Sequence, residues 1–265
     1  MGVKKIATFN VNSVRSRLHI LDRWLNDTNI DILCLQETKT EDSTFPKEFF
    51  HQKGYEVVFC GEKSYNGVAV ASLEKPISVS FGLGDGLLPD GKTRMVHCVF
   101  DGDFHVINLY VPQGKALEHP DYMMKLKFFE RFQNYIDRNF TTESKVVVVG
   151  DLNVAPTDID VTNPRNKKNH VCFHEDVRKA FEALIAWGLV DVFRKHKPKE
   201  GEFSFWDYRV KNALERNIGW RIDHILATKP VAEKSLDAYV AREVRAWERP
   251  SDHAPVVGKF DIFTK

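Results

Sequence analysis

The stretch Ser144–Pro156, SKVVVVGDLNVAP, decides the fold and raises the question of function. Its four consecutive valines do not alternate with polar residues, which is typical of a strand buried on both faces. Gly150 ends the strand, and Asp151 and Asn153 follow it. Side chains two residues apart on an extended chain share a face, so these two groups could reach one small object. Asp and Asn are also ordinary turn residues after a strand, and this stretch alone does not separate the two interpretations.

The composition is that of an ordinary globular protein with a single domain, residues 1–265. The chain is 43% hydrophobic and 28% charged, and no low-complexity linker or tandem repeat divides it. Its net charge of +1 neither favours nor excludes nucleic acid, because recognition depends on local patches. Four scattered cysteines and an N-terminus without a long apolar run predict a cytoplasmic protein that does not contact membranes.

The hydrophobic pattern predicts many strands and a few helices. Helical spacing appears in residues 14–25 (with Ser13 as a possible N-cap), 121–140 and 174–187. The strand-like runs are KKIATFN, DILCLQE, YEVVFC, GVAVASL, RMVHCVF, FHVINLYV, KVVVVGD, RIDHILAT and APVVGKFDI. These elements predict an α/β fold. Because so many strands do not fit one open sheet comfortably, we expect two packed sheets with helices outside.

Polar residues collect where the predicted strands end, as ligand sites in sheet proteins do. They are Asn10, Asn12, Glu37, Lys39, Tyr110, Asp151, Asn153, Asp223, Asp252 and His253. Four of them are carboxylates, which are hard oxygen ligands suited to Mg²⁺ or Mn²⁺. The set predicts metal-assisted hydrolysis of a phosphate ester. Taken singly, each residue could equally be a solvated charge, a turn residue or part of the core.

Asp223 lies between apolar neighbours and therefore needs a partner. His253 is the natural candidate, because a carboxylate on one ring nitrogen fixes the tautomer and raises the pKa of the imidazole. A structural ion pair with Arg221 or Arg249 is the alternative. Asn10, Asn153 and Tyr110 are neutral hydrogen-bond donors, which are suited to holding a phosphate oxygen or a water molecule.

The chain resembles the exonuclease III family of abasic-site endonucleases, within the endonuclease/exonuclease/phosphatase superfamily. The motifs that carry the resemblance are ATFNVNSVRSRL, LQETK, NGVAVAS, NLYVPQG, GDLNVAPTDIDV, FSFWDYR, GWRIDHILAT and PSDHAPVV, and they cover essentially the whole chain in order. The resemblance implies a four-layered α/β sandwich, in which two packed mixed sheets are flanked by helices.

The resemblance also implies roles for the residues of the metal and the dyad. Glu37 would be the principal metal ligand, with Asp252 near the metal and Asn12 contributing. His253 and Asp223 would form the catalytic dyad, which either activates water or holds the scissile phosphate.

Further roles implied by the resemblance concern the nucleophile and the phosphate. Asp151 and Asn153 would position the nucleophile, and Asp151 would alternatively protonate the leaving oxygen. Asn10 and Tyr110 would be hydrogen-bond partners of the phosphate. Whether Asp151 or His253 is the general base stays open.

A second group would select the substrate. Phe205, Trp206, Trp220 and Ile222 resemble the apolar pocket that accepts a flipped sugar lacking its base. A normal nucleotide carries a base too bulky for such a pocket, which gives selectivity by exclusion. Packing in the core is the alternative role for both tryptophans.

Cations in the neighbouring loops could neutralise DNA phosphates without reading sequence. They are Arg15, Arg17 and Lys39, followed by Arg165, Lys167 and Lys168 of NPRNKKNH. Each of them, taken singly, is also compatible with a solvated surface charge.

The leading hypothesis is a monomeric, Mg²⁺-dependent phosphodiesterase (Mn²⁺ is a possible substitute) that acts on double-stranded DNA with abasic sites or 3′ ends. It would incise 5′ to the abasic site, leave a 3′-hydroxyl, and have 3′–5′ exonuclease activity. An RNA 3′-exonuclease or a phosphoinositide phosphatase would keep the fold and change the substrate. A catalytically inactive nucleic-acid-binding protein would have lost some of the polar set, and all of it is intact.

Overall fold

The computed structural model describes residues 2–263, which form two six-stranded sheets packed face to face. The first sheet has the order β11-β12-β1-β2-β4-β3, and the second has the order β5-β6-β7-β8-β10-β9. Both sheets are mixed, because β1 pairs parallel with β2 and antiparallel with β12, while β7 pairs parallel with β8. The predicted two-sheet α/β architecture is confirmed.

The strands are β1 (Gly2–Asn10), β2 (Ile32–Gln36), β3 (Glu56–Glu62), β4 (Tyr65–Ser72), β5 (Ser78–Phe81), β6 (Met95–Phe100), β7 (Phe104–Tyr110), β8 (Lys145–Asp151), β9 (Leu189–Asp191), β10 (Asp223–Thr228), β11 (Ser235–Val240) and β12 (Val256–Phe263). The helices are α1 (Leu18–Asp27), α2 (Lys47–Gln52), α3 (Pro120–Asn139), α4 (Glu175–Trp187), α5 (Val192–His196) and α6 (Lys229–Ala232). Short 3₁₀ helices occupy Arg15–Arg17, Asp42–Thr44, Asp158–Asp160, Pro164–Asn166 and Arg242–Ala246.

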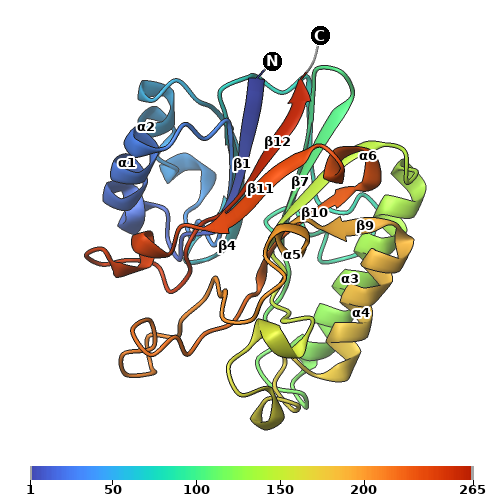
Figure 1. Ribbon diagram of the computed structural model, residues 1–265. Coiled ribbons are helices and arrows are strands. Elements are labelled where there is room, and N and C mark those ends of the chain that lie inside the picture. Colours follow the sequence, from blue (N-terminus) through green and yellow to red (C-terminus); the bar gives the residue numbers. More distant parts are fainter. Residues whose placement is uncertain (1, 264–265) are drawn as a thin grey trace.

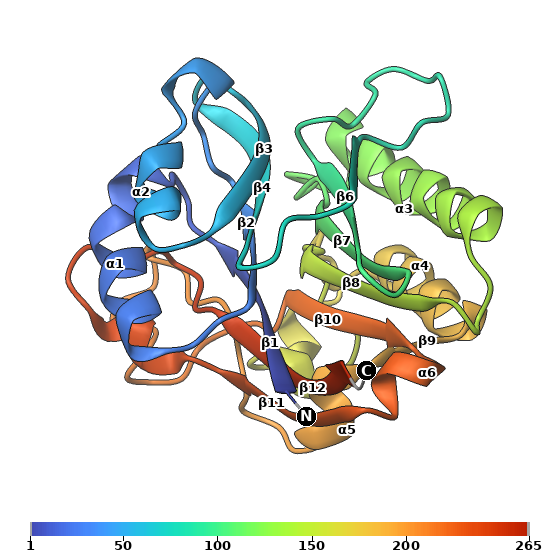
Figure 2. The same cartoon turned by 90° about the horizontal axis from the view of Figure 1, so that it is seen from above.

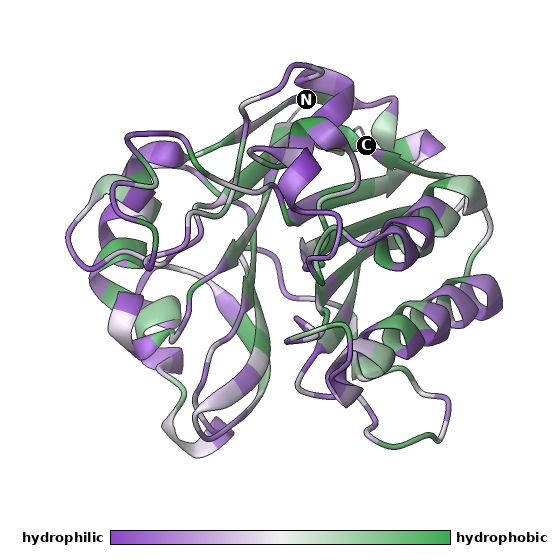
Figure 3. Ribbon diagram, turned by 90° about the horizontal axis from the view of Figure 1, so that it is seen from below, coloured by the Kyte–Doolittle hydropathy of each residue, from purple (hydrophilic) through white to green (hydrophobic). Residues whose placement is uncertain are grey.

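Helices cover the outer faces of both sheets, which gives the four layers that Figures 1 and 2 show. The apolar face of α1 packs with α2 on the first sheet, and α3 and α4 pack on the second. In Figure 3 the strands inside the sandwich are hydrophobic, whereas the outer faces of the helices are largely hydrophilic. None of the helices within residues 2–263 is long and apolar enough to cross a lipid bilayer.

The valine run forms β8, which lies between β7 and β10 inside the second sheet. Val147 and Val149 face the core between the two sheets, whereas Val146 and Val148 face the core under α3 and α4. Both faces of the strand are therefore buried, as the absence of alternation predicts.

Two helices begin close to their predicted positions, and one begins differently. The helix predicted for residues 121–140 is α3, and the one predicted for residues 174–187 is α4, where the side chain of His174 caps the N-terminus. Ser13 does not cap α1. Its φ of 88° turns the chain away from β1, and the helix starts after a 3₁₀ turn, with Ser13 Oγ contacting Ser16 Oγ instead.

Candidate active site

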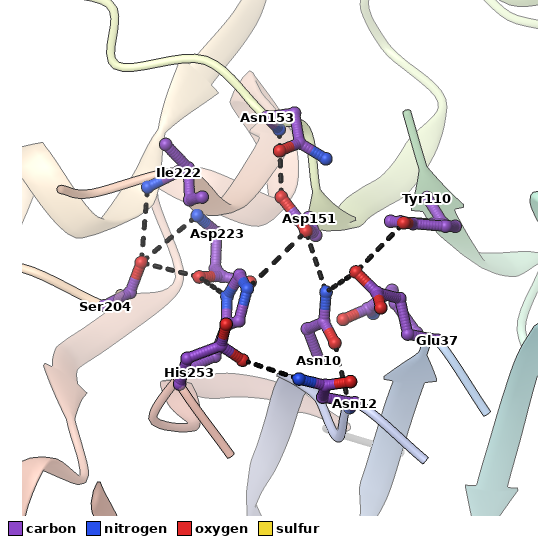
Figure 4. A network of polar contacts seen from close by, with 12 residues as sticks. Asn10, Asn12, Glu37, Tyr110, Asp151, Asn153, Ser204, Ile222, Asp223 and His253 are labelled. Carbon is purple, nitrogen blue, oxygen red and sulfur yellow. Dashed lines mark hydrogen bonds and ion pairs between the residues drawn. The ribbon is translucent and has the colours of Figure 1, made fainter. Parts of the chain in front are cut away.

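The site lies where the carboxyl ends of β1, β2, β7 and β8 meet the start of β10 and the segment before β12 (Figure 4). In the second sheet, strand register places Tyr110 opposite Asp151, and Asp151 opposite Asp223. Asn10 reaches across from the first sheet. Its Nδ2 donates to Asp151 Oδ2 and to Glu37 Oε1, both at 2.9 Å. One buried amide therefore joins the two sheets at the site.

Left-handed backbone turns the chain into the site after three of these strands. Positive φ occurs at Asn12 (43°), Glu37 (50°), Lys39 (51°) and Asn153 (50°). Such conformations cost energy in residues other than glycine and gather at functional sites. Gly150 has φ 147°, and a Cβ there would lie 1.9 Å from the carbonyl oxygen of Leu109. Only glycine therefore lets β8 approach β7 closely just before Asp151.

Glu37 is an ionised carboxylate held by three donors. Its Oε1 accepts from Asn10 Nδ2 and from Tyr110 Oη, both at 2.9 Å, and Lys39 Nζ lies 2.7 Å from Oε2. Burial raises the pKa of Glu37, but the charge of Lys39 and the hydrogen bonds from Asn10 and Lys39 outweigh it, so the pKa is lowered.

Side-chain oxygens of Glu37 and Asn12, two of the residues predicted to bind metal, lie close to the amine of Lys39. Lys39 Nζ lies 2.6 Å from Asn12 Oδ1 and 2.7 Å from Glu37 Oε2, and Asn12 Nδ2 donates to Asp252 Oδ1 at 3.1 Å. A cationic group thus already lies among the oxygens of residues predicted to bind metal. Carboxylate and amide oxygens are the donors that Mg²⁺ and Mn²⁺ prefer, so these residues fit a hard divalent cation.

His253 is paired with Asp223, as predicted. His253 Nδ1 donates to Asp223 Oδ2 at 2.8 Å, and Ser204 Oγ donates to the same oxygen at 2.6 Å. Burial lowers the pKa of His253, but the charge and hydrogen bond of Asp223 raise it more strongly, to about 10. Arg221, the alternative partner for Asp223, instead pairs with Asp160 and Asp191.

Asp151 lies beside the His253–Asp223 pair, and its pKa is raised, whereas that of Glu37 is lowered. Its Oδ1 accepts from the backbone N–H of Asn153 at 2.9 Å, and its Oδ2 lies 3.9 Å from His253 Nε2. Burial and then the charge of Asp223 raise the pKa of Asp151 to about 7, against the effects of His253 and Asn10. Asp151 is therefore a carboxylate that can exchange a proton near neutral pH.

Asp151 and Asn153 both line a cavity at the site, but not because they share one face of an extended strand, as the sequence predicts. β8 ends at Asp151, and the left-handed backbone of Asn153 turns away from an extended path. The side-chain Nδ2 of Asn153 donates to the carbonyl of Val111 at 3.0 Å. A same-face argument that assumed an extended chain fails here, because the strand stops two residues earlier.

A cavity of about 200 Å³ opens beside the carboxylates. Its apolar wall contains Phe205, Trp220 and Ile222, three of the four residues predicted to form a sugar pocket. Trp206 is the exception and corrects the prediction. It is only 1% exposed and packs with Phe203, Ala213 and Ala254 rather than lining the cavity. Successive residues of the short Phe205 bridge point to opposite sides, so Trp206 faces the core.

The cavity also contains polar residues that the sequence interpretation missed. They are Gln113, His170, Cys172, Asp207 and Arg209. All of them come from loops rather than strand ends. The motifs that contain them, VPQG, KKNHVC and WDYR, adjoin predicted site residues, which is the one signal that could have pointed to them.

Lys125 of α3 holds three of the loops around the cavity. Its side chain is fully buried, and Nζ donates to the carbonyls of Gln113 (3.1 Å), Asn153 (2.6 Å) and Val171 (2.7 Å). Burial lowers the pKa of Lys125. A buried amine that satisfies three backbone acceptors is a structural tie between the end of β8 and both neighbouring loops.

The predicted DNA-binding cations lie at different depths. Lys39 is inside the site, and Arg17 Nη2 donates to Tyr208 Oη at 3.3 Å. Lys167 Nζ lies 5.4 Å from the ring centre of Trp220, at the cavity wall. The remaining three, Arg15, Arg165 and Lys168, are exposed.

Comparison with known proteins gives consistent results. The chain is 33% identical to exodeoxyribonuclease III of Haemophilus influenzae, over 97% of this chain and 99% of that protein. Among solved structures, an AP endonuclease from Archaeoglobus fulgidus superimposes with a TM-score of 0.94 at 50% identity, covering 98% and 100% of the two chains. A 3′–5′ exonuclease from Neisseria meningitidis gives 0.91 at 37% identity, covering 97% and 99%. The sequence profile of the Endonuclease/Exonuclease/phosphatase family matches residues 7–253, so this chain belongs to that family.

Proposed function

We propose that this protein is a DNA-repair nuclease that hydrolyses the phosphodiester bond 5′ to an abasic site in double-stranded DNA and leaves a 3′-hydroxyl. The same chemistry at a strand end would give 3′–5′ exonuclease activity. The similarity to an exodeoxyribonuclease and an AP endonuclease over nearly full length supports a DNA substrate over RNA or a phosphoinositide.

The observation that carries the proposal is a small cavity whose lining joins the apolar side chains of Phe205, Trp220 and Ile222 to the carboxylate and histidine cluster. At about 200 Å³ it is smaller than the roughly 300–1,000 Å³ of typical small-molecule pockets. Phe205 connects the apolar side chains of the cavity to the catalytic cluster. Its ring centre is 4.9 Å from that of His253, and its backbone forms a β-bridge with that of Trp220. A sugar without a base would enter this cavity while its 5′ phosphate reaches His253.

A divalent cation, Mg²⁺ or Mn²⁺, would be held by Glu37 with Asp252 and Asn12. When bound, it would offset negative charge on the phosphate. The low pKa of Glu37 supports this role, because the ligand stays ionised without the cation. Asp151, Asp223 and His253 form a second group of potential metal ligands, separate from Glu37, Asp252 and Asn12. Their ligand atoms lie within 4.8 Å of one another.

The residues of the chain would divide the remaining work by their protonation states. His253, kept protonated by Asp223, would donate from Nε2 to a phosphate oxygen. Asp151 would accept a proton from the attacking water as the water oxygen bonds to phosphorus and the bond to O3′ breaks. The departing O3′ then takes up a proton, so that water is added across the P–O3′ bond. Asn10 and Tyr110 would hold Glu37 in place throughout.

One labelled duplex with a single abasic-site analogue tests the proposal, beside an undamaged duplex, each with Mg²⁺, Mn²⁺ or EDTA. We expect a metal-dependent nick 5′ to the lesion, together with a ladder from the 3′ end. If neither duplex is cut with either metal, while RNA or another phosphate ester is cut, the proposed substrate is wrong.

A further inference from the structure

Two histidines face each other on neighbouring strands of the second sheet, and neither of them lines the cavity of the active site. His97 belongs to β6 and His105 to β7, on the face of the sheet that α3 covers (Figure 2). His97 Nε2 lies 2.9 Å from His105 Nδ1, and the two ring centres are 5.1 Å apart. One nitrogen of each ring is therefore directed at the other ring.

The two outer ring nitrogens are held by oxygen atoms. His105 Nε2 lies 3.0 Å from Asp103 Oδ1, and His97 Nδ1 lies 2.8 Å from Tyr135 Oη of α3. Phe140 packs in a T-shaped arrangement against both imidazoles, with its ring centre 5.0 Å from that of His105 and 5.6 Å from that of His97. The orientation of both imidazoles is thus fixed by groups outside the pair.

The hydrogen bonds assign the protons of these four groups. A carboxylate oxygen only accepts, so His105 carries a proton on Nε2, and its neutral ring presents the lone pair of Nδ1 to His97. Burial, together with the charge of His105, lowers the pKa of His97 to about 4, so the His97 ring is neutral at pH 7. His97 then donates from Nε2 to His105 and accepts from the Tyr135 hydroxyl at Nδ1. A single proton, on His97 Nε2, separates the two facing nitrogens.

The same arrangement suits a metal ion bound by two imidazoles. A histidine that binds metal through one ring nitrogen typically donates from the other to a carboxylate or another oxygen, which fixes the ring and its tautomer. Asp103 and Tyr135 are placed to accept in this way from His105 and His97. Metal–nitrogen bonds of about 2.0–2.1 Å place two ligand nitrogens about 2.9 Å apart at a right angle and about 3.4 Å apart at a tetrahedral angle. The observed separation of 2.9 Å is therefore close to what a metal ion requires.

We propose that His97 and His105 form a binding site for a divalent cation of the Zn²⁺ class, with water molecules completing the coordination shell. Imidazole nitrogen suits Zn²⁺, whereas Mg²⁺ prefers oxygen ligands such as those of the active site. The ion takes the place of the proton between the rings. This site goes beyond the proposed nuclease function and does not depend on it.

The proton balance of binding follows from the hydrogen bonds. His97 gives up its proton at Nε2 and takes one up at Nδ1, from which it donates to Tyr135 Oη, while His105 keeps its proton on Nε2. Both rings stay neutral, and the number of protons that they hold does not change. The bound ion links β6 to β7 and, through Tyr135, to α3. It stabilises the folded chain, because the unfolded chain has no preformed pair of ligands.

A calorimetric titration with Zn²⁺ tests the site, in excess Mg²⁺ so that the oxygen ligands of the active site are occupied. His97→Gln and His105→Gln each remove one ligand. His51→Gln is the matched control, because the His51 side chain is 43% exposed on α2. We expect the wild-type protein and the control to bind Zn²⁺ equally, and the two ligand variants to lose the binding of one ion per chain. Asp103→Asn should weaken it by roughly tenfold, as the loss of an outer hydrogen-bond partner does.

The ring nitrogens of the wild-type protein give a second readout that needs no variant. In ¹⁵N spectra of the histidine rings, Zn²⁺ should shift the signals of His97 Nε2 and His105 Nδ1 and move the His97 proton from Nε2 to Nδ1. Signals that stay unchanged up to the highest zinc concentration would overturn the proposal and leave the pair a structural hydrogen bond only. Zinc binding that is undiminished in both His97→Gln and His105→Gln would overturn it as well. If these variants do not fold, the spectra of the wild-type protein decide.

Discussion

At the scale of single residues, the site places two carboxylates in opposite electrostatic states. Glu37 keeps a lowered pKa because Lys39 and Asn10 compensate its burial. The pKa of Asp151 is instead raised to about 7, because burial and the charge of Asp223 outweigh the opposing charge of His253. Titratable groups whose surroundings push their pKa values apart can take different roles in one reaction. One is suited to holding a cation, and the other to moving a proton.

Replacing Glu37 by Gln tests the role in cation binding. The variant keeps the shape of the side chain and an acceptor for Asn10 and Tyr110 but removes the negative charge. We expect the nuclease rate to fall by roughly 10²-fold and half-saturation with Mg²⁺ to require roughly 10- to 100-fold more metal. A Mg²⁺ titration of the initial rate measures both effects.

Glu130→Gln is the matched control, because Glu130 is exposed on α3. It should leave the rate and the Mg²⁺ requirement unchanged. A Glu37→Gln variant with a normal Mg²⁺ requirement would remove Glu37 from the cation site.

At the scale of elements, buried charges hold the loop that follows β8. Asp160 accepts from Arg221 Nε at 2.7 Å and also pairs with Arg194, and its other oxygen accepts from Thr157. Arg221 Nη2 reaches Asp191 at 2.8 Å. Since Arg221 lies two residues before Asp223, this network ties the loop after Asp151 to the start of β10.

Asp160→Asn should therefore destabilise the fold by about 3 kcal/mol at pH 7, because it leaves two arginines without their buried partner. Burial raises the pKa of Asp160, but Arg221 and Arg194 lower it far more, so the net shift is downward. The stabilisation is thus complete above the unfolded-state pKa of about 4 and is lost as the pH falls below it. Urea unfolding at pH 7 and pH 3 should show a difference between wild type and variant that shrinks at pH 3.

Asp158→Asn is a suitable comparison two residues away. Asp158 is 71% exposed and meets Arg178 at 3.6 Å, so its loss should cost less than about 1 kcal/mol. A difference between wild type and Asp160→Asn that stays constant with pH would contradict the assignment of an ionised, ion-paired Asp160.

Lys125→Met tests the tie between the loops of the cavity. Three buried carbonyls would lose their donor, so we expect a loss of about 2 kcal/mol in the free energy of unfolding. The nuclease rate should fall as well, because Asn153 and Gln113 lose the contact that positions their backbone. Lys127→Met, at an exposed position of the same helix, should change neither. Normal stability and activity in Lys125→Met would exclude the tie.

The elements that the sequence predicted are those with a strong hydrophobic pattern. β8 is predicted by its apolar run, and α3 and α4 by their helical stripes. β5, β9 and β11 were missed. β5 is an edge strand of mostly exposed residues, β11 is an edge strand whose buried and exposed residues do not alternate regularly, and β9 has only three residues, so none of them carries a clear alternation.

The site residues also divide into those that the sequence predicts and those that it misses. Strand-end residues such as Glu37 and His253 stand out because polar groups interrupt apolar runs. His170 and Lys125 do not stand out, because one lies in a basic loop and the other in an amphipathic helix. Only tertiary packing brings them to the cavity. Trp206 shows the opposite case, since its place in a family motif could not reveal that the side chain faces the core.

At the scale of the whole molecule, the two sheets form one frame for the reaction. Beneath the site, Gln36 of the first sheet donates to Asn108 of the second at 2.6 Å, and Asn108 donates to the carbonyls of Leu35 and Ala69. The buried amides of Gln36 and Asn108, together with that of Asn10 at the site, hold the strand ends of the two sheets in fixed positions relative to each other. A monomeric state and a cytoplasmic location stay predictions from the sequence.

The central claim is that water is added across the phosphodiester bond 5′ to an abasic site. The most direct measurement is cleavage of a singly lesioned duplex in ¹⁸O-labelled water with Mg²⁺, followed by mass analysis of both fragments. We predict one ¹⁸O atom in the 5′-phosphate of the fragment that carries the abasic sugar, and an upstream fragment that a polymerase extends from its 3′-hydroxyl. A break on the 3′ side of the lesion, with an unsaturated sugar end and no ¹⁸O, would contradict the claim.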